Sequence, residues 1–97
     1  MKIALDAMGG DLAPQATVQG ALDALNHTQD NLHIILVGDK SQIQSELGNS
    51  IPNGLTIHPA TEVVTMHDDG STVLRAKPDS SIVQGIRLIK DKKADAF

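Results

Sequence analysis

The chain has 97 residues, 40% of them hydrophobic, which is enough for one small buried core. Eight basic and twelve acidic side chains give a formal net charge of −4, and this balance disfavours nucleic acid as a partner. Because no cysteine is present, these residues offer no disulfide and no thiol nucleophile, which fits a reducing cytoplasm. The longest apolar run, Ile34–Val37, falls far short of the roughly 20 residues that span a membrane, and the acid at Asp6 comes too early for a secretory signal.

Two elements are predicted in the first 26 residues. A strand covers Lys2–Leu5 and stops at Asp6. A helix begins at Pro14, a residue suited to a first helical turn, and ends near Asn26. Its buried face is predicted from apolar residues at positions i, i+3, i+4 and i+7, which are Val18, Ala21, Leu22 and Leu25.

Two strands and a short helix are predicted in the middle of the chain. Leu32–Val37 is apolar at nearly every position, which is typical of a strand buried on both faces of a parallel sheet. Asp39 and Gln42 have the spacing of a capping box, so we expect a helix from there to Gly48. Leu55–His58 predicts a third strand.

The last third begins with Ala60–Lys77, the least regular and most polar stretch. A helix is predicted from Ser80 to about Asp91, with Asp79 as its N-cap. Its buried face is expected to hold Ile82, Val83, Ile86 and Ile89. Ala94–Phe97 has the pattern of the start of another strand.

This order of elements predicts an α/β fold with a mostly parallel sheet and flanking helices. We expect residues 1–97 to be one α/β unit, the first part of a longer domain cut inside a strand.

The segment Asp6–Pro14 lies between a predicted strand and a predicted helix, where open α/β sheets bind ligands. The adjacent Gly9 and Gly10 let backbone N–H groups approach an anion, and the helix that follows directs its positive end toward the same place. The motif therefore predicts a phosphate site. The alternative is a tight turn in which Asp11 merely caps the helix.

A second polar cluster precedes the last helix. Arg75 and Lys77 supply positive charge, and Ser80 and Ser81 supply hydroxyl groups at a helix N-terminus. Such groups suit an oxyanion or phosphoryl ligand. Alternatively, the serines belong to a simple helix cap and the two cations are solvated.

Several other site types are disfavoured. The sequence contains neither the G-x-G-x-x-G nor the P-loop pattern, and we do not expect NAD binding. His67, Asp68 and Asp69 are expected to form a polar loop rather than a metal site, since adjacent residues rarely converge on one ion. The other histidines are interpreted as structural, and catalytic residues stay unassigned.

Three stretches closely resemble the PlsX family of phosphate acyltransferases, which act in bacterial phospholipid synthesis. They are Met1–Pro14, Leu36–Asp39 and Leu74–Ser81, and the likeness continues to Lys93–Phe97. At Leu12 the family usually has His. The family's chains are much longer, so the resemblance implies that these residues are an N-terminal fragment, inactive alone.

The resemblance implies transfer of a fatty acyl group from acyl-[acyl-carrier protein] to inorganic phosphate, giving acyl phosphate. It also implies a fold similar to isocitrate and isopropylmalate dehydrogenases, and a cytoplasmic homodimer that needs no metal or organic cofactor. Peripheral contact with the membrane and with the downstream glycerol-3-phosphate acyltransferase is a further implication. The residues expected to bind phosphate or substrate are Asp6, Gly9, Gly10, Asp11, Arg75, Lys77, Ser80 and Ser81.

Two alternatives stay open. The chain could be a non-catalytic α/β domain that binds a phosphate ligand or a protein, as receiver domains do, although Asp6 stands alone on its strand. It could also be a fragment that does not fold stably, because a cut strand leaves a parallel sheet uncovered.

Overall fold

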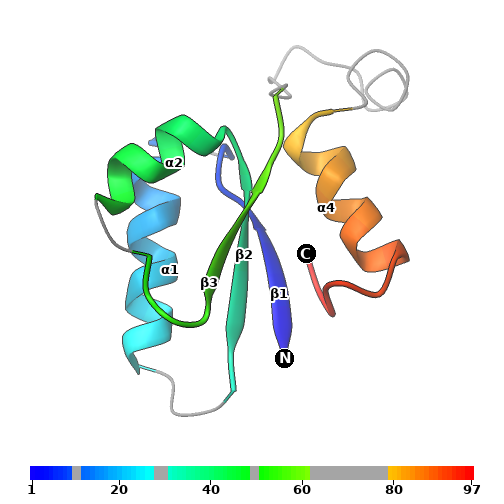
Figure 1. The fold of residues 1–97 in the computed structure, drawn as a ribbon, viewed down its shortest axis with the longest axis horizontal. Coiled ribbons are helices and arrows are strands. Elements are labelled where there is room, and N and C mark those ends of the chain that lie inside the picture. Colours follow the sequence, from blue (N-terminus) through cyan, green and yellow to red (C-terminus); the bar gives the residue numbers. More distant parts are fainter. Residues whose placement is uncertain (10–11, 28–30, 49–50, 62–78) are drawn as a thin grey trace.

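The computed structural model describes residues 1–9, 12–27, 31–48, 51–61 and 79–97 (Figure 1). Three parallel strands form one sheet, and their spatial order across the sheet is the same as their order in the sequence. They are β1 (Lys2–Asp6), β2 (His33–Gly38) and β3 (Leu55–Pro59). In this register Ile34 of β2 lies between Ile3 of β1 and Leu55 of β3. The predicted α/β class with a parallel sheet is confirmed.

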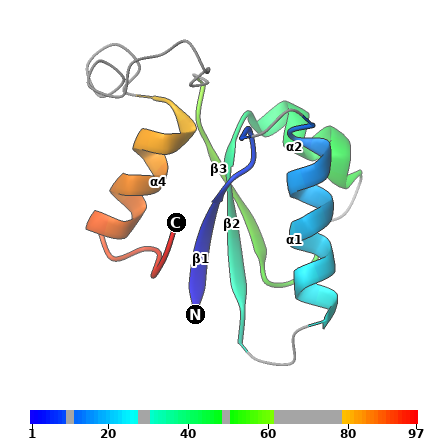
Figure 2. The ribbon, with the colours of Figure 1, turned by 180° about the vertical axis from the view of Figure 1, so that it is seen from behind.

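Helices cover both faces of this sheet (Figures 1 and 2). On one face lie α1 (Gln15–His27) and α2 (Lys40–Leu47), and on the other lies α4 (Ser81–Lys90). None of the helices in the described ranges is long and apolar enough to cross a bilayer.

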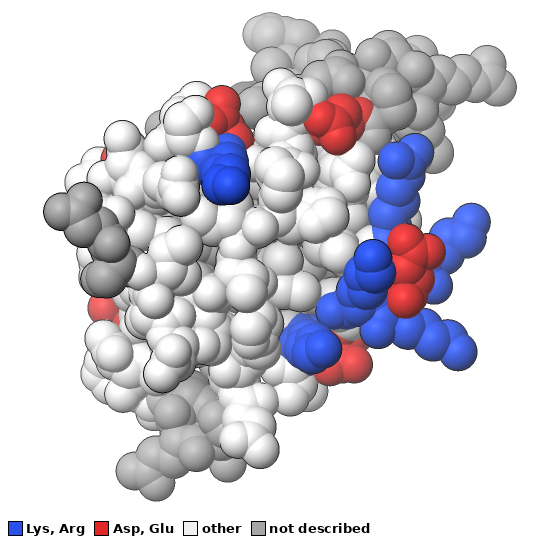
Figure 3. Space-filling model, viewed as in Figure 1, with Lys and Arg blue, Asp and Glu red and all other residues white. Residues whose placement is uncertain are grey.

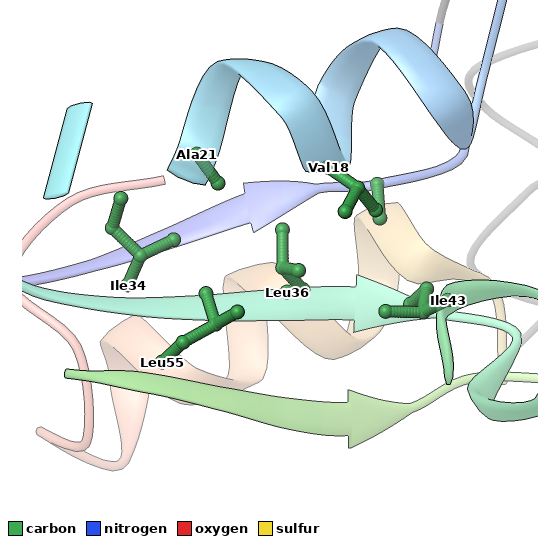
Figure 4. Close-up of a cluster of buried hydrophobic side chains, with 7 residues drawn as sticks. Val18, Ala21, Ile34, Leu36, Ile43 and Leu55 are labelled. Atoms are coloured by element: carbon green, nitrogen blue, oxygen red, sulfur yellow. The ribbon is translucent and has the colours of Figure 1, made fainter. Parts of the chain in front are cut away.

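The two-sided burial of β2 explains its nearly continuous apolar sequence. Ile34 and Leu36 pack against α1 and α2, whereas Val37 faces α4. In Figure 4, Val18 and Ala21 of α1 lie over Leu36 and Ile34. Leu36 is fully buried, and burial of such a side chain contributes about 1.5–3 kcal/mol. The predicted core face of α1 is confirmed, because Leu22 and Leu25 also pack against this cluster.

The ends of α2 follow the local sequence. Asp39 is the N-cap, and its Oδ1 accepts a hydrogen bond of 3.1 Å from the Gln42 backbone N–H. Gly48 ends the helix with a φ of 77°, and its N–H donates to the Gln44 carbonyl. Both caps are as predicted. Glycine suits the C-cap because it adopts this positive φ without strain.

Two predictions about α4 are wrong. Its N-cap is Ser80 rather than Asp79, because the Ser80 hydroxyl accepts the Val83 N–H while Asp79 bonds elsewhere. Ile86 and Ile89 are 49% and 37% exposed rather than buried. The buried face instead carries Ser81, Val83, Gly85 and Leu88. Small residues in this row let the helix approach its neighbours closely, which turns the two isoleucines outward.

The segment after α4 returns to the outer edge of β1. Ala96 pairs with Ile3 in parallel, and its carbonyl accepts a 2.8 Å hydrogen bond from the Ala4 N–H. This pairing agrees with the predicted strand start at Ala94–Phe97. The Phe97 ring lies against Gly85, where an added Cβ would be 2.1 Å from the ring. A side chain at position 85 would therefore force the Phe97 ring to move.

Candidate functional site

The carboxyl ends of the three parallel strands meet at one edge of the sheet, where α/β proteins bind ligands. The turn after β1, the start of α1 and the start of α4 all lie at this end (Figures 1 and 2). Because β1 leads to α1 on one face and α4 covers the other, groups from both faces of the sheet are available at this edge.

The turn after β1 is shaped by Asp6. Its Oδ1 accepts a 3.0 Å hydrogen bond from the Met8 backbone N–H, and its carbonyl accepts the Gly9 N–H at 3.4 Å. An aspartate that bonds the backbone two residues ahead is a common turn device. The visible contribution of Asp6 is therefore to fold this turn, which leaves Gly9 exposed.

This turn is packed onto the end of β2. The Ala7 N–H donates to the Val37 carbonyl at 2.9 Å, and the Met8 side chain covers Gly38. A Cβ on Gly38 would lie 2.7 Å from Met8 Cγ and 3.0 Å from its sulfur. Glycine at position 38 thus lets Met8 hold the turn close to the sheet.

Thr17, in the first helical turn of α1, also holds the loop that follows β1. Its hydroxyl bonds to the carbonyl oxygens of Ala7 and Pro14, the latter at 3.0 Å. The sequence analysis missed this residue. A threonine in a first helical turn, three residues after Pro14, is the signal that could have identified it.

The start of α4 is buried. Ser80 and Ser81 are 0% and 1% exposed, and Ser80 Oγ accepts the Val83 N–H at 3.3 Å. The Ser80 hydroxyl thus serves as the helix cap. The positive end of the helix dipole lies here and favours negative charge nearby.

A hydrogen-bond network joins the start of α4 to the end of β3. Asp79 accepts bonds from the Thr61 backbone N–H at 2.9 Å, from the Thr61 hydroxyl, and from Gln84 Nε2 at 2.8 Å. The amide oxygen of Gln84 lies 3.2 Å from His58 Nε2. The hydroxyl and N–H of Thr61 lower the pKa of Asp79 below its usual value, followed by smaller contributions from Gln84 and His58. Sequence reasoning missed the network because Thr61 and Asp79 lie 18 residues apart.

Half of the predicted site residues can be located. Those that lie at this end of the sheet are Asp6, Gly9, Ser80 and Ser81. The others, which fall outside the described residues, are Gly10, Asp11, Arg75 and Lys77. The predicted polar loop with His67, Asp68 and Asp69 also falls outside them.

Positive charge in the described part of the chain gathers at the opposite end of the fold. Lys2 begins β1, Arg87 and Lys90 lie in the last turn of α4, and Lys92 and Lys93 follow it. Figure 3 shows Lys and Arg side chains grouped over this side. Within the described residues, Lys40 at the start of α2 is the basic side chain that lies at the carboxyl end of the sheet. Among the described residues there is no group of three or more His, Cys, Asp or Glu that could hold a metal ion.

Comparison with known sequences identifies the family. A family described as "Fatty acid synthesis protein" matches residues 1–97, the whole chain. The chain belongs to this family. Its curated relatives include phosphate acyltransferases, which confirms the resemblance to the PlsX phosphate acyltransferases.

Three of these relatives show how much of the family's length is present. The phosphate acyltransferase of Pelotomaculum thermopropionicum is 48% identical over 100% of this chain, which covers 28% of that protein. That of Dictyoglomus turgidum is 45% identical over 98% of this chain and 28% of its own length. That of Acetivibrio thermocellus is 42% identical over 100% of this chain and 29% of its own length. The chain therefore spans less than a third of these relatives.

Proposed function

We propose that these residues form part of an acyltransferase that moves a fatty acyl group from acyl-[acyl-carrier protein] to inorganic phosphate, releasing acyl phosphate. Family membership supports this reaction class. The observation that carries the proposal is the arrangement at the carboxyl end of the sheet, where an exposed glycine turn and the start of α4 lie at one edge. The positive end of the α4 dipole at this edge suits a phosphate acceptor.

In this proposal, phosphate lies against the turn at Gly9 and Gly10 and near the N-terminus of α4. Arg75 or Lys77 offsets its charge, and Ser81 contributes at the first turn of the helix. Asp6 acts through the turn that it folds, since a carboxylate in direct contact would repel the anion. The group that stabilises the thioester oxygen during transfer lies outside this set.

The residues of this segment bind and orient the acceptor in this scheme. The phosphate oxygen attacks the thioester carbon, and the thiol of the acyl-carrier protein leaves. Binding groups held in fixed positions lower the barrier because they need not reorganise as charge moves. The backbone of the turn after β1 is held in place in this way, since Met8 packs on Gly38 and the Thr17 hydroxyl donates to the Ala7 carbonyl.

The test is phosphate kinetics in a full-length chain carrying these residues. We expect Lys77→Ala and Ser81→Ala each to raise the KM for phosphate, with little change in the KM for acyl-[acyl-carrier protein]. Lys90→Ala and Ser45→Ala are matched controls, since Lys90 ends α4 and Ser45 is exposed on α2. Unchanged phosphate kinetics in both test variants would remove the assignment. Phosphate binding without acyl phosphate formation would favour the non-catalytic binding domain.

Further features belong to the same proposal. We propose a single α/β domain of the isocitrate/isopropylmalate dehydrogenase type for the full-length protein, working as a cytoplasmic homodimer without a metal or organic cofactor. Contact with the membrane and with a glycerol-3-phosphate acyltransferase would be peripheral. Family membership is the support for each of these features.

A further inference from the structure

One apolar groove of the fold is lined by α1 and β1. Its volume is about 360 Å³, and its walls include Ile3 and Leu5 from β1 and Gly20, Ala21 and Ala24 from α1. Ile3 and Leu5 are half-buried, whereas their neighbours Ile34 and Leu36 on the same face are 5% and 0% exposed. The α1 side of β1 is thus less covered than the α1 side of β2.

The wall formed by α1 is made of small residues. Gly20 lies in mid-helix and is exposed, and a Cβ added there would meet nothing within 4 Å. Glycine in a helix interior costs about 1 kcal/mol relative to alanine. Nothing within the described residues requires that cost, in contrast to Gly38 and Gly85, which each receive a side chain. A glycine at this position suits the close approach of another backbone.

The sheet extends toward the groove. Ala96 pairs with Ile3 on the outer edge of β1, so another strand position exists beyond β1. On the opposite face, α4 covers β1, with Leu88 packed near Ala4. A parallel sheet is normally covered on both faces. The groove over the α1 side of β1 therefore lies where one more helix, packed beside α1, would complete the helical layer on this face of the sheet.

We propose that a helix from the part of the full-length protein outside these 97 residues packs into this groove, with its backbone close to Gly20. The curated relatives supply the necessary chain, since these residues span 28–29% of their length. Helices that meet over small residues pack at the short end of the usual 8–10 Å interaxial range. This inference concerns assembly of the fold and does not depend on the proposed phosphate chemistry.

The test compares Gly20→Leu with Gln19→Leu in the full-length protein. Gln19 is the neighbouring exposed position on α1, so the control adds the same side chain beside the groove. With a helix in place, Gly20→Leu overfills the site and lowers the Tm by about 3 °C or more, whereas Gln19→Leu changes it little. An open groove gives the opposite sign, because removing a helical glycine stabilises α1. A Tm that is unchanged or raised in Gly20→Leu overturns the proposal.

A smaller substitution keeps the proposal testable if Gly20→Leu fails to fold. We expect Gly20→Cys to react with a maleimide at least about tenfold more slowly than Gln19→Cys, because burial of the thiol slows the reaction. A benzophenone maleimide used on the same variant should give cross-links within one chain, to residues outside these 97. Equal labelling rates, or cross-links between two chains, overturn the proposal. Protection that appears solely when acyl substrate is bound also overturns it, since the groove would then hold the acyl chain.

Discussion

The packing of Met8 over Gly38 can be tested with a double-mutant cycle. In Gly38→Ala, the new Cβ would lie 2.7 Å from Met8 Cγ and 3.3 Å from Ile43 Cδ1, so Met8 must move. Overpacking of this kind costs about 1–3 kcal/mol. Met8→Ala alone loses part of a half-buried side chain, which we estimate at about 1 kcal/mol.

The double variant should cost about as much as Met8→Ala alone, because alanine at position 8 leaves room for the new methyl group. The coupling free energy is then about 1–3 kcal/mol in the stabilising direction. Urea denaturation of the four full-length chains measures it from the midpoints and slopes. The KM for phosphate should rise in Gly38→Ala and return toward the parent value in the double variant. Additive costs of the two substitutions would refute the reasoning, because the two side chains would then not compete for the same space.

Three further outcomes are expected. Thr17→Val should lower stability by about 1–3 kcal/mol and raise the KM for phosphate, since two carbonyl oxygens lose their hydroxyl partner; Thr17→Ser should restore both, and failure of that rescue would contradict the role of the hydroxyl. Ser80→Ala should cost about 1 kcal/mol in thermal unfolding through loss of the α4 cap, and an unchanged Tm would contradict the cap. Because folding lowers the pKa of Asp79, the ionised carboxylate stabilises the fold when the pH is above 3.8, the usual pKa of the group. This stabilisation is lost as the pH falls through the lower folded-state pKa. Asp79→Asn should therefore lower the Tm at pH 7, and this effect should disappear once the pH has fallen below the lowered folded-state pKa of Asp79; a pH-independent difference in Tm would exclude this cause.

Local sequence patterns were sufficient to predict the helices and strands and most of the α/β fold class. The apolar run of β2 and the period of α1 predicted elements close to those observed, because each pattern reflects burial on known faces. The caps of α2 were predicted for the same reason, since Asp39 and Gly48 act within a few residues of themselves. The glycine turn after β1 was likewise recognisable from its place between a strand and a helix.

The orientation of α4 could not be predicted from its own residues. Its apolar periodicity favoured a face with Ile86 and Ile89, yet the buried row is the one that contains Gly85. The buried row is the one that meets the rest of the fold, since Leu88 packs in a cluster with Ala4 and Val37 of the sheet and the Phe97 ring lies over Gly85. Residues far apart along the chain decide which face of this helix is buried.

The sequence by itself determined the α/β class, the order of elements, the family and the position of a candidate anion turn. Each of these depends on short-range patterns or on motifs that lie within one segment. The tertiary structure alone decided the contacts that hold the site: Met8 on Gly38, the Thr17 hydroxyl on Ala7, and Thr61 with Asp79. These contacts join residues 10–30 positions apart, and their geometry exists only once the strands are paired and the helices are packed on them.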